Sequence, residues 1–445
     1  MKVIVQLRTS PAASAAAMVA TAAGAVMENL QSLSSSLVFD RAYLPVQLPG
    51  VQPTTGAALG SLAQPLTFAV EAAASTYLVR GSIADGSSQA SAYQAAMAHP
   101  DVVGVYADPV IESCITCGNS NAVGTAATVA SLLSKAKLTA KKFDGAGVFL
   151  AIVDTGINLA FLKNLGISAK LDVAKSWVPA GVATTPGAHP VNHGTMCAFD
   201  ALIAAPKATL LDHAVLLSRT PGANQMAGLL SDAVQAYAKL RTVLNAMPAA
   251  KKALVVSNSW GMFSPGSDFP VGHPGNYSDN PNHPFNLMVA TLEADGADIL
   301  FAAGNCGRDC PDGRCQFNNL PSICGANSHP SVLSIGGVDT QKRRVGYSSQ
   351  GPGRLTKRKP DVACYTHFTG SGVFSPEPDS GTSAACPVAA GVVAAVRTKH
   401  RVAKISPLQL RTLVQKTAED KSTVGFDYDY GWGILSVSGL LAGLP

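Results

Sequence analysis

From residue 148 onward, short continuous apolar runs alternate with longer stretches of helical periodicity. Continuous apolar runs are typical of strands that are buried on both faces of a parallel sheet. A strand followed by a helix, repeated along the chain, predicts an α/β domain with a mainly parallel central sheet and helices on both faces. The expected strands are 148–153, 209–216, 253–256, 299–303 and 332–335, and the expected helices are 193–205, 225–247 and 284–295.

Length and composition exclude several classes of protein. The 445 residues suggest roughly two or three domains, and 47% hydrophobic with 14% charged residues excludes intrinsic disorder for the bulk of the chain. The net charge of +5 includes no run of five like charges and no basic stretch interleaved with aromatic residues, so nucleic-acid binding is not predicted. No stretch is apolar enough for a membrane span.

The first 112 residues predict a separate, small α+β unit. The expected order of strand, helix, two strands, helix and strand is the ferredoxin-like pattern. This part carries a net charge of −3 and the remainder +8, which favours their docking. Residues 113–140 are expected to contain an exposed linker, and 141–445 the α/β domain. The expected elements of the small unit are a strand at 3–7, a helix at 14–30, extended segments at 37–48 and 76–83, a helix at 87–99 and an extended segment at 102–111, with 49–64 unassigned.

Three polar residues stand at the ends of expected elements. Asp154 closes a buried apolar run, where a carboxylate is costly without a cationic or donating partner. His193 opens an expected helix. Ser383 precedes the segment 388–396, which is apolar on all sides and is therefore expected to be a central helix with Pro387 in its first turn.

These three side chains suit nucleophilic catalysis. A serine hydroxyl becomes a strong nucleophile when an imidazole removes its proton, and a carboxylate orients the imidazole and stabilises its cation. The oxyanion that follows needs donors aimed at it in advance. The main-chain N–H of Ser383 and the side-chain amide of Asn305, which closes another apolar run, are the predicted donors.

The surrounding motifs resemble those of the subtilisin-like serine peptidases, the subtilases. The chain order Asp, His, Ser is the subtilisin order and differs from that of chymotrypsin and of the α/β-hydrolases. The matching blocks are AIVDTGI at 151–157, HGT at 193–195, AAGN at 302–305 and GTSAA at 381–385, with SNSWG at 257–261, YSSQGP at 347–352, KPD at 359–361 and YGWG at 430–433. The sequence departs from the family after KPD, where Ala363 is followed by Cys instead of Pro-Gly.

The resemblance implies a subtilisin-like fold and a serine endopeptidase that forms an acyl-enzyme on Ser383. It implies that an extended polypeptide substrate pairs with the strand edge of the cleft. Such a reaction requires no cofactor, no metal-binding residues are assigned, and no loop declares a site for calcium, which is common in the family. The residues implied in substrate binding are Ser259, Trp260, Gly261, Ala303 and Gly304.

The resemblance also implies that residues 1–112 are an inhibitor-type propeptide. Residues 103–110 are similar to the segment of such propeptides that runs into the active site. The propeptide would act as an intramolecular inhibitor, and the enzyme would remove it by a cut in the region 113–140. The chain is therefore expected to be made as a self-inhibited, self-processing precursor.

Two other functions are compatible with parts of the sequence. The motifs Asp154-Thr-Gly and Asp379-Ser-Gly are also what a bilobal aspartic peptidase shows, but that class needs mostly β-structure and leaves His193 and Asn305 without roles. A subtilase fold that binds peptides without cutting them is the second alternative.

The nine cysteines leave the redox compartment open. Cys306, Cys310, Cys315 and Cys324 follow Asn305 closely, and loop disulfides are favoured over a structural zinc site or free thiols. Cys197 and Cys386 are expected to be buried, with a thiol sensitive to mercurials as the alternative. Residues 9–27 predict an amphipathic helix more than an export signal. Localisation is therefore uncertain, with a preference for an intracellular or unconventionally exported protein, although disulfides would fit an exported form.

Overall fold

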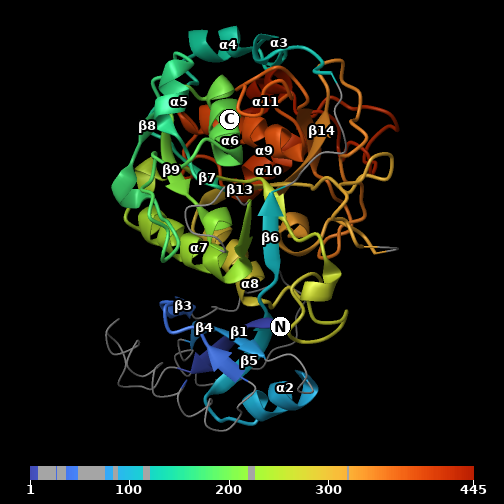
Figure 1. The fold of residues 1–445 in the computed structure, drawn as a ribbon. Coiled ribbons are helices and arrows are strands. Elements are labelled where there is room, and N and C mark those ends of the chain that lie inside the picture. Colours follow the sequence, from blue (N-terminus) through green and yellow to red (C-terminus); the bar gives the residue numbers. More distant parts are fainter. Residues whose placement is uncertain are drawn as a thin grey trace, which may run out of the picture. The chain divides into compact units, whose positions relative to one another are not determined.

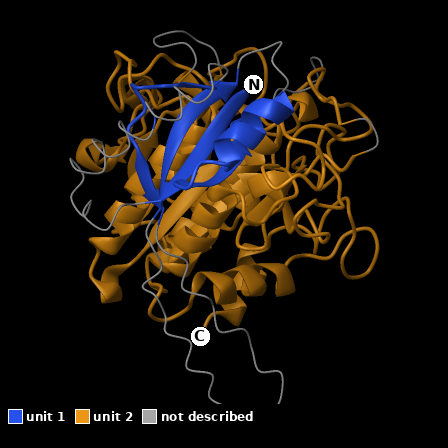
Figure 2. Cartoon of the chain, turned by 90° about the horizontal axis from the view of Figure 1, so that it is seen from below, with its two compact units in different colours: residues 1–108 blue, residues 109–445 orange. Residues whose placement is uncertain are grey.

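The computed structural model describes residues 1–8, 27, 37–48, 76–83, 89–113, 121–218, 226–317 and 320–445. These residues divide into two compact units, 1–108 and 109–445, which Figure 2 shows in different colours. Among the described residues, the first unit contains one sheet and the second contains two.

The first unit is built on an antiparallel sheet with the strand order β2-β4-β1-β5, in which β3 also pairs with β4. The segment expected to be extended over 37–48 instead forms two short strands, because the chain turns at Asp40, whose side chain accepts a hydrogen bond from the Ala42 nitrogen. The helix expected at 14–30, apart from residue 27, and the segment 49–64 lie outside the described residues. The elements are β1 (Lys2–Arg8), β2 (Leu37–Phe39), β3 (Val46–Leu48), β4 (Thr76–Ile83), α2 (Gln89–Met97) and β5 (Val102–Ala107).

The second unit contains a seven-stranded sheet with the order β15-β14-β13-β11-β7-β9-β8. All neighbouring strands are parallel, and the central strands are buried along their whole length, which confirms the α/β fold class. The strands are β7 (Phe149–Val153), β8 (Lys170–Leu171), β9 (Thr209–His213), β11 (Leu254–Asn258), β13 (Ala297–Ala302), β14 (Leu333–Val338) and β15 (Val362–Tyr365). The two strands at the edges of the sheet, β8 and β15, were not among those expected.

Helices cover both faces of this sheet (Figure 1). On one face α6 (His193–Ala204) packs on α9 (Thr382–Arg397), and α9 contacts β11, β13 and β14; on the other, α7 (Leu230–Asn245) packs on α8 (Pro284–Ala294). Every residue of α9 is buried, as its apolar sequence predicts. No helix among the described residues has the length and apolar character needed to cross a bilayer. The remaining helices are α3 (Ala126–Leu132), α4 (Lys135–Ala140), α5 (Leu159–Asn164), α10 (Pro407–Lys416) and α11 (Val437–Gly443).

The start of α9 corrects one expectation. The helix begins at Thr382, so Pro387 lies inside it and not in its first turn. A proline has no N–H to give to the carbonyl four residues earlier, which is that of Ser383. That carbonyl instead accepts a hydrogen bond of 2.9 Å from Oγ of Ser259. The proline therefore allows the first turn of α9 to bond to the strand edge beside it.

A second, three-stranded antiparallel sheet has the order β10-β6-β12. The extended segment expected at 102–111 is split at Pro109, and its second half, β6 (Val110–Ser113), lies between β10 (Ala227–Leu229) and β12 (Trp260–Gly261). The helix expected at 225–247 begins only at residue 230, because the residues before it form β10. Residues 126–140, which fall within the expected linker, form α3 and α4 and pack on the core.

Candidate active site

The predicted catalytic residues lie at the edge of the parallel sheet where the strands end. Asp154 directly follows β7, and Asn305 lies three residues beyond β13. His193 is the first residue of α6, and Ser383 is the second residue of α9. Because α6 and α9 pack together, residues that are far apart in the sequence meet at this edge.

His193 and Asp154 form a buried hydrogen-bonded pair. Nδ1 of His193 lies 2.8 Å from Oδ1 of Asp154, which also accepts a hydrogen bond of 2.7 Å from the Thr155 nitrogen. Asn192 caps α6 by accepting a hydrogen bond from the His193 nitrogen. A carboxylate at Nδ1 places the proton of the neutral imidazole on that nitrogen and leaves Nε2 as the basic atom.

Ser383 lies beside this pair but is turned toward the strand edge. Its hydroxyl donates to the carbonyl of Ser259 at 3.3 Å, and Nε2 of His193 has no hydrogen-bond partner among the described residues. The predicted hydrogen bond from serine to imidazole is therefore not formed in this conformation. Cys197 connects the two helices here, since its sulfur lies 3.7 Å from Nδ1 of His193 and 3.6 Å from the Ser383 carbonyl.

The amide of Asn305 is held in one orientation by Thr382. Oδ1 of Asn305 accepts hydrogen bonds from the main-chain nitrogen and from the hydroxyl of Thr382, at 2.9 and 3.0 Å. The amide nitrogen is thereby directed toward Gly381. A Cβ at Gly381 would lie 2.8 Å from that nitrogen and 3.3 Å from the main-chain nitrogen of Ser383, so the two predicted oxyanion donors converge next to a residue without a side chain.

Cys197 is a neutral thiol in this environment. Burial raises its pKa well above the ordinary value, and the nearby charge of Asp154 raises it further. One ligand atom from each of Asp154, His193 and Cys197 could be brought to a metal ion, since these atoms lie within 4.8 Å of one another. A metal would need the thiolate. Burial disfavours the thiolate, so the sulfur of Cys197 packs as a neutral thiol against the predicted catalytic pair.

The chain's own segment β6 occupies the cleft in which a substrate was expected to bind. Ser113 pairs with Trp260, and Glu112 pairs with Gly261 on one side and Ala227 on the other. The strand edge predicted for substrate pairing thus has an extended segment on it. The indole of Trp260 itself is buried in the core, against Phe285 and Phe301, so only its main chain faces the cleft.

Ala303 and Gly304, which were also predicted to bind the substrate, lie at the site in a different way. Neither pairs with β6; both line a small cavity together with Gly261 and Phe263. The Gly304 nitrogen donates to the Thr382 hydroxyl at 3.0 Å. Sequence reasoning missed β10, Thr382 and Gly381. The glycine within the expected helix at 225–247 was the available signal for β10, because a glycine in a helical pattern often marks an interruption.

The cysteines after Asn305 do not form a zinc site. Cys306 and Cys315 are joined by a disulfide, with their Cα atoms 5.8 Å apart, and Cys310 is also disulfide-bonded. Cys324 is a buried free thiol. The disulfide between Cys306 and Cys315 therefore closes the loop that follows the predicted oxyanion residue, in line with the loop disulfides favoured from the sequence.

The aspartic peptidase alternative is wrong. Asp379 does not face Asp154: its carboxylate accepts hydrogen bonds from the nitrogen and hydroxyl of Ser371, and it lies beside Asp200. Burial, followed by the charge of Asp379, raises the pKa of Asp200 well above its ordinary value, so Asp200 is a neutral acid next to Asp379. The sheet around Asp154 is parallel and covered by helices, not the β-structure that two lobes would need.

The fold and the residues at this edge are those of a serine hydrolase built on a parallel α/β sheet. A family model described as "Subtilase family" matches residues 145–433. A curated relative, subtilisin DY of Bacillus licheniformis, is 25% identical over 314 residues, which is 69% of this chain and 95% of that protein. The chain belongs to the subtilase family, and it is a subtilisin-like serine endopeptidase that acts on polypeptides.

Proposed function

We propose that the enzyme cleaves peptide bonds through an acyl-enzyme on Ser383. Nε2 of His193 takes the hydroxyl proton while Oγ of Ser383 bonds to the carbonyl carbon, and the imidazolium then gives that proton to the leaving amine as the C–N bond breaks. Water hydrolyses the ester with His193 acting as base again. The observation that carries this proposal is the buried 2.8 Å contact between His193 and Asp154 beside the head of α9.

The same proposal assigns the oxyanion site to Asn305 and to the main chain of Ser383. The double contact from Thr382 supports this assignment, because it orients the amide before the reaction. Preorganised donors of this kind stabilise the charge that develops on the substrate oxygen. All groups in the proposed steps belong to the polypeptide, so we propose that the reaction needs no cofactor.

We further propose that the chain is a self-inhibited precursor and that residues 1–112 act as its propeptide. The position of β6 between β10 and β12 supports this proposal, since a bound peptide would add a strand in the same way. One step beyond the pair Ser113–Trp260, a peptide residue opposite Ser259 would present its carbonyl to Ser383. We therefore expect the cut at the peptide bond between residues 114 and 115.

Incubation of the purified chain tests activity and processing together. The wild-type chain should acquire a new N-terminus at Ile115, read by mass spectrometry, and should hydrolyse unstructured peptides. The Ser383→Ala chain should remain uncut. Its kcat for peptide hydrolysis should be about 10⁶-fold lower than that of the wild type, by analogy with subtilisin. Peptide hydrolysis by Ser383→Ala at the wild-type rate would contradict the assignment.

A subtilase that only binds peptides is the remaining alternative. The absence of a hydrogen bond between Ser383 and His193 in this conformation is the observation that favours it. A fluorophosphonate probe separates the two functions, because it reacts only with an activated serine. Labelling of the mature wild-type chain at Ser383, with none of Ser383→Ala, supports the peptidase.

A further inference from the structure

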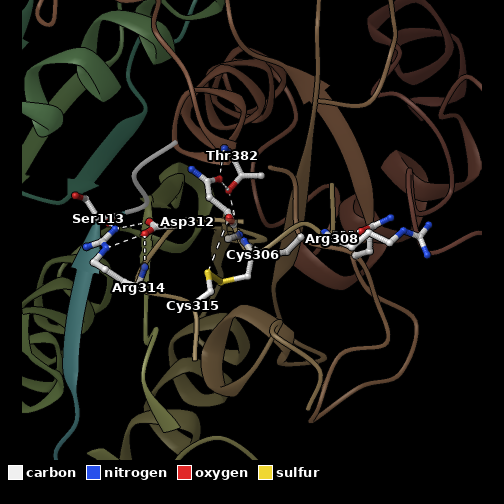
Figure 3. Close-up of a disulfide and its surroundings, with 11 residues drawn as sticks. Ser113, Cys306, Arg308, Asp312, Arg314, Cys315 and Thr382 are labelled. Carbon is white, nitrogen blue, oxygen red and sulfur yellow. Dashed lines mark hydrogen bonds and ion pairs between the residues drawn. A yellow bond between two sulfur atoms is a disulfide. The ribbon is translucent and has the colours of Figure 1, made fainter. Parts of the chain in front are cut away.

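Arg314 contacts the segment that occupies the cleft. Its Nη2 donates to the Ser113 carbonyl at 2.7 Å (Figure 3). Its Nη1 lies 3.2 Å from Oε1 of Glu112. Both charged side chains are partly shielded from solvent, with 27% and 28% of their surfaces exposed. One guanidinium therefore binds a main-chain carbonyl and a side-chain carboxylate of the same extended strand.

The loop that carries Arg314 is fixed to the predicted oxyanion residue. The disulfide between Cys306 and Cys315 closes the loop directly after Asn305 (Figure 3). The nitrogen of Asp312 donates to the Asn305 carbonyl at 2.8 Å, and the nitrogen of Cys315 donates to the Asp312 carbonyl at 2.9 Å. Arg314 is thus held at a set distance from the catalytic edge.

The guanidinium itself is oriented by two further contacts. The buried carboxylate of Asp312 accepts hydrogen bonds from Nε and Nη2 of Arg314, at 3.1 and 2.6 Å. The guanidinium also lies over the ring of Phe263, 4.3 Å from its centroid. Asp312 contacts Nε and Nη2, whereas Nη1 faces Glu112. Because the guanidinium is planar and held by these contacts, its hydrogen-bond donors are already oriented before a ligand binds.

The strand register says which peptide position Arg314 would contact. Glu112 pairs with Gly261, Ser113 pairs with Trp260, and the next position along β12 is opposite Ser259, beside the hydroxyl of Ser383. Counting away from the scissile bond on its amino side, the residue opposite Ser259 is first. The position of Ser113 is then second, and that of Glu112 is third.

We propose that Arg314 is a specificity-determining residue of the peptidase. It selects substrates with an acidic side chain, Glu or Asp, at the third residue before the scissile bond, and it binds the carbonyl of the second residue whatever the sequence. This inference rests on the proposed function, because it takes β6 as the image of a bound substrate. The inference adds a substrate class to the proposed function: peptides with Glu or Asp at the third residue before the scissile bond.

Peptides that differ only at the third position test the inference on the mature wild-type enzyme. A matched set carries Glu, Gln or Lys there, and kcat/KM is measured for each. We expect Glu to exceed Gln by about fivefold, which is near the upper end for a partly exposed ion pair, and Lys to be poorer than Gln. The ratio of Glu to Gln should fall toward one in about 1 M salt, where charges are screened over roughly 3 Å.

Variants of the disulfide loop separate the effect of the Arg314 side chain from that of the rest of the loop. Arg314→Gln should lose the preference for Glu and raise KM for all three peptides, whereas Arg314→Glu should prefer Lys. Arg308→Gln is the matched control, because Arg308 belongs to the same disulfide loop (Figure 3). Its side chain is 73% exposed and pairs with Asp429 instead of with β6. This control variant should leave the profile unchanged.

The outcomes distinguish this inference from the proposed function. Equal kcat/KM for the Glu, Gln and Lys peptides on wild-type enzyme whose Ser383 reacts with a fluorophosphonate would overturn the role of Arg314 and leave the peptidase intact. This measurement needs no variant, so it holds even if Arg314→Glu does not fold. Absence of both labelling and hydrolysis would overturn the two proposals together.

Discussion

Thr382 gives two hydrogen bonds to the side-chain oxygen of Asn305, one from its main-chain nitrogen and one from its hydroxyl. Thr382 also precedes Ser383 in the chain, so the residue before the proposed nucleophile sets the direction of the Asn305 amide after β13. The hydroxyl of Thr382 in turn accepts from the Gly304 nitrogen. One threonine therefore joins α9 to the loop after β13 at the predicted oxyanion site.

The first prediction compares the two partners of this contact. Asn305→Ala should lower kcat by about 10²- to 10³-fold, because it removes a donor from the proposed oxyanion site. Thr382→Val should lower kcat by only about five- to tenfold, since the main-chain hydrogen bond to Asn305 is kept and a single hydrogen bond is worth about 1 kcal/mol. Thr382→Ser, which keeps the hydroxyl, is the control. A loss for Thr382→Val as large as that for Asn305→Ala would show that the threonine does more than orient the amide.

The second prediction concerns Gly381. Its φ of 79° is strained for any residue with a Cβ, and such a Cβ would press against the amide nitrogen of Asn305. Gly381→Ala should therefore reduce kcat at least about tenfold and lower the free energy of unfolding by about 1 to 2 kcal/mol. Gly372→Ala separates the two effects, because Gly372 has a similar φ of 71° but open space around its Cβ. It should cost stability and leave kcat unchanged; equal losses of kcat in both would reject the crowding argument.

The sequence predicted those parts of the molecule that depend on local patterns. The buried strands of the parallel sheet are continuous apolar runs, and Asp154, His193 and Ser383 stand at the ends of elements, as expected. The apolar helix α9 was expected to be central for the same reason.

The parts that the sequence did not predict depend on contacts between distant segments. Ser113 and Arg314 are 201 residues apart, and neither has a neighbour in sequence that signals the other. The pairing of Cys306 with Cys315 was one of several that the spacing allowed. In β10, three residues that continue a helical pattern are pulled into a strand by pairing with β6, because tertiary contacts override weak local preference.

The third prediction concerns the thiol of Cys197, which packs against the proposed catalytic pair. Cys197 is almost fully buried, and burial raises its pKa, so very little reactive thiolate is present near neutral pH. Iodoacetamide at about pH 8 should therefore leave the activity of the folded enzyme unchanged. Cys197→Val, a replacement of similar volume, should keep kcat within about threefold of the wild type. Inactivation by iodoacetamide in the wild type but not in Cys197→Val would show that the thiol is accessible and this reasoning wrong.

The last prediction follows from a buried histidine at the end of β9. Burial lowers the pKa of His213 from 6.5 to about 3, while the unfolded chain keeps the ordinary value. The unfolded state therefore binds a proton as the pH falls below about 6.5 and the folded state does not, so acid removes stability over the range down to about pH 3. His213→Gln cannot take up this proton. Between pH 6.5 and 4.5 the unfolding free energy of His213→Gln should fall by about 2 to 3 kcal/mol less than that of the wild type. Each of these two pH units is worth about 1.4 kcal/mol for a proton that only the unfolded chain binds. Urea unfolding of both chains in a Ser383→Ala background, which prevents self-digestion, measures the difference, and parallel losses in the two chains would contradict it.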